Sequence, residues 1–174
     1  MQAFVDALNN IRDFMDLGGG VLWAIMLVTF LMWMFIIERI WYLYFIAPSR
    51  LQALQAEWDG RADTSSWYAR RIREAMISRA SDELNQNVLY IKTLIAICPL
   101  LGLLGTVTGM IQVFDVMALT GTGNARAMAS GVSKATVPTM AGMVAALSGI
   151  FLSSRIERKA ESEAALLEDE LKYH

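Results

Sequence analysis

The sequence predicts an all-α membrane protein with three transmembrane helices, two of which extend into the cytoplasm. Three observations lead to this fold class. Of the 174 residues, 55% are hydrophobic, yet the charged residues are gathered in blocks rather than spread along the chain. Between these blocks lie three uncharged runs, at residues 17–37, 93–114 and 135–154. Each run suffices for a membrane span, because a spanning helix needs about 20 predominantly apolar residues.

The first element expected is an amphipathic helix over residues 1–16, lying in the outer membrane interface. Its apolar positions recur at helical spacing, and they are Phe4, Leu8, Ile11 and Met15. Residues 17–41 then form the first span, which ends in a belt of aromatic residues beginning at Trp41. This span is too long for the apolar part of a signal peptide and has no cleavage site after it, so we expect it to stay in the protein.

Residues 42–92 are expected to form a helical cytoplasmic loop. Pro48 should end the first long helix, and a short amphipathic helix should follow over residues 51–58. Asp59-Gly60 and the polar residues after it predict a turn. No helix breaker is evident between Trp67 and Tyr90, so this stretch is expected to continue without interruption into the second span.

The second span is assigned to residues 93–114 and the third to residues 135–154, with a short periplasmic loop and the start of the last helix at 115–134. Beyond the third span, residues 155–174 predict a cytoplasmic helix with a narrow apolar stripe. The stripe consists of Ile156, Ala160, Ala164, Leu167 and Leu171. A stripe this narrow is typical of a seam between two helices.

The orientation of the chain is predicted by its basic residues, because cytoplasmic loops are enriched in Lys and Arg. From the end of the first uncharged run to the start of the second lie Arg39, Arg50, Arg61, Arg70, Arg71, Arg73, Arg79 and Lys92. After the third span come Arg155, Arg158, Lys159 and Lys172. The N-terminal arm holds only Arg12, and the segment between the second and third spans holds only Arg126 before Lys134 opens the last span. The N-terminus is therefore expected outside and the C-terminus in the cytoplasm.

The second span contains an unusual segment, "LGLLGTVTGM" at residues 101–110. On a helix, its small residues fall within a sector of about 100° and form a strip almost free of side chains. They are Gly102, Gly105, Thr106 and Gly109. The third span has a matching face of Ala135, Thr139, Gly142, Ala146 and Gly149. Helices in lipid associate by close backbone approach over small residues, so these faces should pack tightly, either within one chain or between chains.

Thr106 and Thr139 are the candidate polar groups of this region, each in a small-residue stripe with a proline nearby. The alternative is that each hydroxyl simply bonds a carbonyl of its own helix. Pro99 and Pro138 lack an N–H and so free carbonyls one turn earlier, unless they merely kink their helices. Hydroxyls together with freed carbonyls would line a weakly polar lumen.

The three uncharged runs contain no Asp or Glu. A proton-translocating device normally needs a titratable group inside the membrane, so a partner helix would have to supply the carboxylate. Lys134, at the start of the third span, either reaches to the interface or lines the mouth of a pore. With one cysteine, Cys98, and one histidine, His174, the sequence predicts no metal site, no cofactor and no enzyme active site.

The segments "CPLLGLLGTVTGMIQVF" and "GVSKATVPTMAGMVAALSGIF" resemble the second and third helices of the ExbB/TolQ/MotA proton-channel family, most closely its ExbB branch. The resemblance covers about residues 85–155. It implies a pentamer in the bacterial inner membrane, whose lumen encloses the single-span helices of an ExbD-like partner. An aspartate of that partner would carry the proton, and the work would pass to a TonB-like protein. Membrane lipid is a further expected partner, and nucleic acid is not.

The resemblance also implies roles for individual residues. Thr106 and Thr139 match threonines that would face the partner's carboxylate. The residues that match the family's signature in the second span are Pro99, Gly102, Gly105 and Gly109. Two departures stand out: Lys134 occupies a position where glutamate is common, and Pro138 stands where alanine is more usual. The lysine reverses the charge at the outer end of the lumen.

The function expected from the sequence is therefore that of a motor subunit coupling ion flow to mechanical work for outer-membrane transport. A TolQ-like subunit for envelope maintenance is one alternative. A non-conducting scaffold that stabilises a single-span partner is another, because glycine and alanine faces fit both. Transport driven by the proton gradient in cells carrying Thr106→Ala or Thr139→Ala distinguishes a motor from a scaffold.

Overall fold

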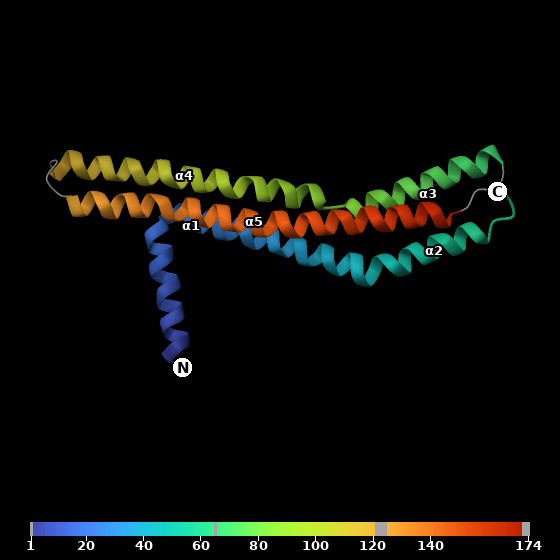
Figure 1. Cartoon of the computed structure of the whole chain (residues 1–174), viewed down its shortest axis with the longest axis horizontal. Helices are drawn as coiled ribbons and strands as arrows, with labels where there is room; N and C mark the ends of the chain where they lie inside the picture. The colour runs from blue at the N-terminus through green and yellow to red at the C-terminus, as the bar shows by residue number, and fades with distance from the viewer. Residues whose placement is uncertain (1, 65, 121–124, 172–174) are drawn as a thin grey trace. The chain divides into compact units, whose positions relative to one another are not determined.

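The computed structural model describes residues 2–64, 66–120 and 125–171, and Figure 1 shows that they are almost entirely helical. The elements are α1 (Gln2–Trp41), the π-helix η1 (Tyr42–Ile46), α2 (Ala47–Asp59), α3 (Trp67–Asn85), α4 (Val88–Thr120) and α5 (Ala125–Glu170). Three stretches of helix are long and apolar enough to cross a membrane. The all-α fold with three candidate spans is thereby confirmed.

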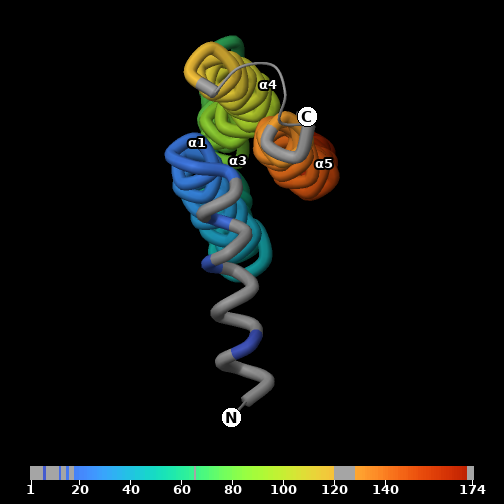
Figure 2. Tube along the Cα trace, turned by 90° about the vertical axis from the view of Figure 1, so that its left-hand side faces the viewer, coloured from blue at the N-terminus to red at the C-terminus, as the bar shows by residue number. Residues whose placement is uncertain are grey.

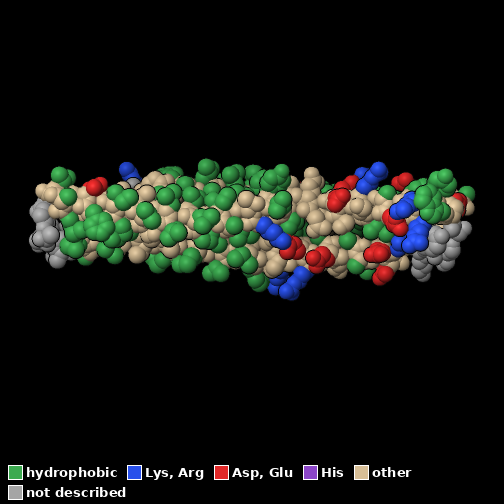
Figure 3. Space-filling model, turned by 90° about the horizontal axis from the view of Figure 1, so that it is seen from above, with side chains coloured by type: hydrophobic (Ala, Val, Ile, Leu, Met, Phe, Trp, Pro, Cys, Tyr) green, Lys and Arg blue, Asp and Glu red, His purple; other side chains and the backbone are tan. Residues whose placement is uncertain are grey.

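The chain divides into two compact units, and each is described by itself. The first unit comprises Met1–Met32 and Thr93–Gly149, and the second comprises Trp33–Lys92 and Ile150–His174. The first unit thus takes in parts of α1, α4 and α5 that are largely apolar. On the face shown in Figure 3, most of the charged side chains gather over one part of the chain, and hydrophobic side chains are numerous where the charged ones are few.

In the first unit, α1 is interrupted at Gly19, whose backbone has φ 60° and ψ −157°. Glycine adopts such positive φ angles without a steric penalty, so a helix that must be broken at its entry to a span can use it there. The expected apolar stripe of the N-terminal arm falls mainly on side chains outside the described part. Its last member, Met15, is buried in a cluster with Leu22, Ile25 and Val137.

The three helices of the first unit pack around this cluster. Leu22 and Ile25 come from α1 and Val137 from α5, and Leu101 of α4 packs against them. Helices α4 and α5 lie side by side in both Figure 1 and Figure 2. This arrangement brings the small-residue faces of the second and third spans into contact.

The second unit begins with a departure from the sequence expectation. The long first helix does not end at Pro48 but passes through the π-helical turn Tyr42–Ile46 directly into α2. Pro48 lies in the first turn of α2, directly after the π-helical turn, a position that proline tolerates better than the interior of a helix. A widened turn is thus sufficient to accommodate the proline.

The expected uninterrupted helix from Trp67 into the second span is also wrong. Helix α3 ends at Asn85, and α4 begins at Val88. Between them Asn87 adopts a left-handed conformation with φ 65°, which asparagine tolerates better than most residues. The Asn87 side chain donates a hydrogen bond of 3.3 Å to Glu38 of α1, which holds the break in place.

The core of the second unit joins α2, α3 and the end of α5. It is made of Trp58, Ala69, Met76, Ala80, Leu167 and Leu171. Ile156 and Ala160 of the predicted apolar stripe are buried as well, so its expected role as a helix seam is confirmed. At the C-terminal end of α5, Arg73 of α3 donates hydrogen bonds to the carbonyl oxygens of Glu168 (2.6 Å) and Leu171 (2.5 Å). Carbonyl groups at the end of a helix have no N–H partner in the next turn, so the arginine satisfies them.

Two ion pairs that involve α5 accompany this apolar packing. Lys92 lies 2.6 Å from the carboxylate of Glu157, and Lys159 lies 2.5 Å from that of Glu163, one turn further along the same helix. The hydrogen bond to Glu163 raises the pKa of Lys159. Both pairs are partly exposed, so each contributes only modestly to stability.

Candidate functional site

The seam between α4 and α5 brings two backbones into direct contact. A Cβ atom added to Gly102 would lie 2.9 Å from Cα of Thr139, and one added to Gly109 would lie 2.7 Å from Cα of Ala135. At Gly142 the added atom would meet the backbone carbonyl of Cys98. No real Cβ fits at these distances. The two small-residue faces therefore pack on each other within one chain.

Pro138 occupies the centre of this seam. Its side chain is fully buried, and an atom added to Gly105 would collide with its ring. The glycine thus leaves the space that the ring fills. Further along, an atom added to Gly149 would lie 2.6 Å from both Ile95 of α4 and Met32 of α1, so α1 closes the seam at that end. Pro99 and Pro138 both lie inside helices that continue past them.

Thr139 is the one candidate whose hydroxyl reaches across the seam. It is partly buried, and its hydroxyl donates a hydrogen bond of 2.8 Å to the carbonyl oxygen of Gly102. A hydroxyl that donates one hydrogen bond can still accept others through its lone pairs. Thr139 therefore joins α4 to α5 and keeps an acceptor available.

Thr106 behaves differently. Its hydroxyl donates to the carbonyl of Leu103 in its own helix at 2.7 Å. Thr108 and Thr136 make the same kind of local bond, to Leu104 and Ser133 respectively, each at 3.0 Å. Within this chain the hydroxyl of Thr106 thus bonds a carbonyl of its own helix, and the two candidate threonines do not bond to each other. The side chain of Thr120 lies outside the described part.

Lys134 lies away from the Thr139 bond, on a groove that the sequence reasoning missed. We call it the glycine groove. It has a volume of about 300 Å³ and is lined by Gly18, Gly19, Gly20, Val21, Gly105, Thr108, Gly109, Gln112 and Lys134. Two signals could have pointed to it: three consecutive glycines where the first span begins, and a glutamine inside the second uncharged run.

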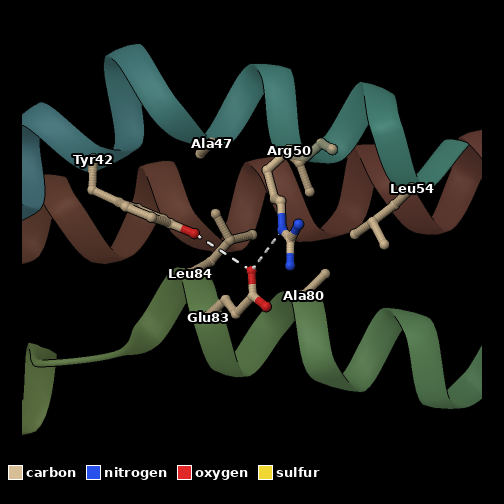
Figure 4. Close-up of a pocket in the computed structure, with 8 residues that line it drawn as sticks. Tyr42, Ala47, Arg50, Leu54, Ala80, Glu83 and Leu84 are labelled. Atoms are coloured by element: carbon tan, nitrogen blue, oxygen red, sulfur yellow. Dashed lines mark hydrogen bonds and ion pairs between the residues drawn. The ribbon is translucent and has the colours of Figure 1, made fainter.

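A second polar cluster links the helices of the second unit to one another (Figure 4). The hydroxyl of Tyr42 points at Oε2 of Glu83 at 3.5 Å, and Nε of Arg50 lies 3.6 Å from the same oxygen. Arg39 donates to the backbone carbonyl of Glu83 and is only 1% exposed. Its guanidinium also lies 4.6 Å from the centre of the Tyr42 ring. We call these four residues the Glu83 cluster, and its geometry is that of a structural fastening between α1, α2 and α3.

Neither site has the chemistry of a metal centre. Within residues 2–64, 66–120 and 125–171, no three His, Cys, Asp or Glu side chains come close enough to hold a metal ion. Cys98 is fully buried against α5, where its backbone carbonyl meets Gly142. The seam thus offers hydroxyl and carbonyl oxygens as its polar groups.

With this geometry established, comparison with known proteins places the chain. The model of the MotA/TolQ/ExbB proton channel family matches residues 46–169, which include α2, α3, α4 and nearly all of α5. The matched region contains the whole seam.

Individual relatives agree with the family match. A putative biopolymer transport protein ExbB-like 1 of Synechocystis is 47% identical over 60 residues, covering 33% of this chain and 24% of that protein. A second Synechocystis protein, ExbB-like 3, is 34% identical over 86 residues, 48% of this chain and 40% of the relative. The biopolymer transport protein ExbB of Salmonella typhimurium is 36% identical over 80 residues, 46% of this chain and 33% of the relative. The matches thus span less than half of each relative.

Proposed function

This chain belongs to the MotA/TolQ/ExbB proton channel family, and on that premise we propose that it is a subunit of a motor driven by the proton-motive force in a bacterial inner membrane. In this proposal an ExbD-like single-span partner supplies the proton-carrying carboxylate, and a TonB-like protein receives the work for outer-membrane transport. The names of the Salmonella and Synechocystis relatives, biopolymer transport proteins of ExbB type, support this branch over the others.

The observation that carries the proposal is the hydroxyl of Thr139 bonded to the carbonyl of Gly102. The three uncharged runs contain no acidic side chain, so a carboxylate at this depth must come from another chain. A charged carboxylate in an apolar lumen is costly unless something donates hydrogen bonds to it. The Thr139 hydroxyl can donate either to Gly102 or to such a carboxylate, and it can accept a hydrogen bond when the carboxylate is protonated.

The assembly follows from what a single chain leaves uncovered. Only 22%, 22% and 33% of the three most apolar stretches are buried within the chain. Lipid can cover one side of such helices, and neighbouring copies with a central partner can cover the others. We propose a pentamer with its N-terminus outside and its C-terminus in the cytoplasm, in which α4 and α5 line the lumen.

The proposal is tested by measuring proton flux in liposomes loaded with a pH-sensitive dye. The full chain alone should conduct poorly, and addition of an ExbD-like partner should produce flux. Thr139→Ser should remain mostly active with the partner. Thr139→Val, which has nearly the same shape, should slow flux by about ten- to a hundredfold, because a hydrogen bond to a charged group is worth roughly 1.5–3 kcal/mol.

Three results would contradict the proposal. Strong flux through the chain alone would show that no partner carboxylate is needed. Normal partner-dependent flux with Thr139→Val, in complexes of unchanged mass, would make this threonine a packing residue. A complex that binds its partner firmly and conducts nothing under any condition would instead indicate the scaffold function.

A further inference from the structure

The glycine groove lies where three membrane spans end together. Gly18 and its neighbours begin the first span, Gln112 lies near the end of the second, and Lys134 immediately precedes the third. One end of the groove, at Lys134 and Gln112, therefore sits at the boundary between apolar and polar side chains on the first unit, and the groove continues from there along α4 to Gly105. In a bilayer this is the depth at which lipid headgroups are found.

The polar groups of the groove favour a negatively charged ligand. Lys134 is exposed, and no Asp or Glu is among the described residues that line the groove. The amide of Gln112 adds two donors beside this ammonium group. A Cβ added to Gly19 or Gly20 would meet no atom within 4 Å, so the backbone there is open to the groove. Phosphate oxygens are acceptors of the kind that such a set of donors binds.

An apolar surface continues from the groove along the same face of α1. Gly20, Trp23, Leu27 and Phe30 follow one another at spacings of three and four residues, which places them on one side of the helix. Trp23, Leu27 and Phe30 are 57%, 59% and 66% exposed, and with Ala24 and Met26 they line an apolar hollow of about 610 Å³. A ligand that fits both parts has an anionic head and a hydrocarbon tail.

We propose that the glycine groove binds an anionic phospholipid, with its phosphate between Lys134, Gln112 and the open backbone at Gly20 and with an acyl chain along Trp23, Leu27 and Phe30. The inference requires only that the chain is embedded in a membrane, so it stands independently of proton flow. Lys134 gives the groove its charge preference.

The test uses the full chain in nanodiscs of phosphatidylcholine that contain a small fraction of phosphatidylglycerol with a photoreactive acyl chain. After illumination, mass spectrometry should find the label on the peptide that contains residues 20–30. Lys134→Glu should lower this labelling at least about fivefold, because it replaces attraction by repulsion. Lys134→Arg should retain it. Gly20→Leu should also lower it, since the new side chain has room to fold into the groove without a clash.

The controls separate this site from general attraction of lipid to charge. Arg158→Gln removes one positive charge elsewhere on α5 and should leave labelling of residues 20–30 unchanged. Photoreactive phosphatidylcholine should label this peptide several-fold less than phosphatidylglycerol. Equal labelling by the two lipids, labelling that survives both Lys134→Glu and Gly20→Leu, or displacement by millimolar inorganic phosphate would each overturn the proposal, the last by identifying a site for free phosphate.

Discussion

Thr139 and Gly102 are joined across the seam by a hydrogen bond of 2.8 Å, in which the threonine hydroxyl of α5 donates to the glycine carbonyl of α4. The hydroxyl of Thr106, by contrast, donates to Leu103 within α4. The two candidate threonines thus differ in what their hydroxyls bond within the chain. The Thr139 hydroxyl links α5 to α4, whereas the Thr106 hydroxyl bonds a carbonyl one turn earlier in its own helix.

This difference predicts unequal effects on stability. Thr139→Val should lower the free energy of unfolding by about 0.5–1.5 kcal/mol, because it removes a bond between helices. Thr106→Val should change it by less than about 0.5 kcal/mol, because the bond lost there is local. Unfolding of the purified chain by SDS titration, followed by circular dichroism, measures both. Equal losses would show that the Thr139 bond does not stabilise the seam.

The glycines of the seam should not tolerate even one added carbon. Gly142→Ala places a methyl group against the backbone carbonyl of Cys98, which can yield only if α4 and α5 separate. We expect a loss of about 1–3 kcal/mol in the same unfolding assay. Gly20→Ala is the matched control, because open space surrounds that position and alanine is the better helix former. A Gly142→Ala variant as stable as Gly20→Ala would contradict the close approach.

Gly105 provides a related test of where the seam forms. The sequence alone suggests that Gly105→Leu would prevent assembly of several chains. Since the contact of Gly105 is with Pro138 of the same chain, the first effect should be loss of α4–α5 pairing within the chain. Cysteines introduced at exposed ends of the two helices should then crosslink less efficiently, even in monomers isolated in detergent. Unchanged crosslinking alongside a lost oligomer would place the contact between chains instead.

The core of the second unit offers a pair of adjacent leucines. Leu167 is 1% exposed and packs with Trp58 and Met76, whereas Leu166 is 51% exposed. Leu167→Ala should cost about 2–4 kcal/mol through the cavity it leaves, and Leu166→Ala should cost little. Urea unfolding monitored by tryptophan fluorescence compares them. Similar midpoints for the two variants would show that α5 is not packed against α2 and α3.

The Glu83 cluster predicts that replacing its buried arginine, Arg39, destabilises the second unit more than replacing its exposed arginine, Arg50. Arg39→Met should destabilise the second unit by about 1–3 kcal/mol, because the Glu83 carbonyl loses a charged donor. Arg50→Met should cost less than about 1 kcal/mol, since the Arg50 and Glu83 side chains are 60% and 42% exposed. Limited proteolysis near Gln86-Asn87 should accelerate only in the first variant. Acceleration in both would assign the fastening to the exposed ion pair.

The sequence by itself determined the fold class, because the feature that decides it is local. Three long uncharged runs can be satisfied only as helices in a bilayer, and the charged blocks between them must lie outside it. The apolar stripe from Ile156 to Leu171 was readable for the same reason, since helical periodicity depends on neighbours a few residues apart. The family motif around Gly102, Gly105 and Thr106 was likewise contained in one short segment.

Only the tertiary structure decided what each small or polar residue meets. The resemblance implied that Thr106 and Thr139 both face a partner's carboxylate, yet the bond from Thr139 to Gly102 depends on how α4 and α5 are aligned. It left open whether the glycine faces meet within or between chains, and contacts such as Gly109 with Ala135 show that they meet within one. The break at Asn87 and the π-helical turn at Tyr42–Ile46 were not foreseen, because partners distant in sequence, such as Glu38, help to hold them. Local propensity cannot reveal such partners, since they are close only after the helices have packed.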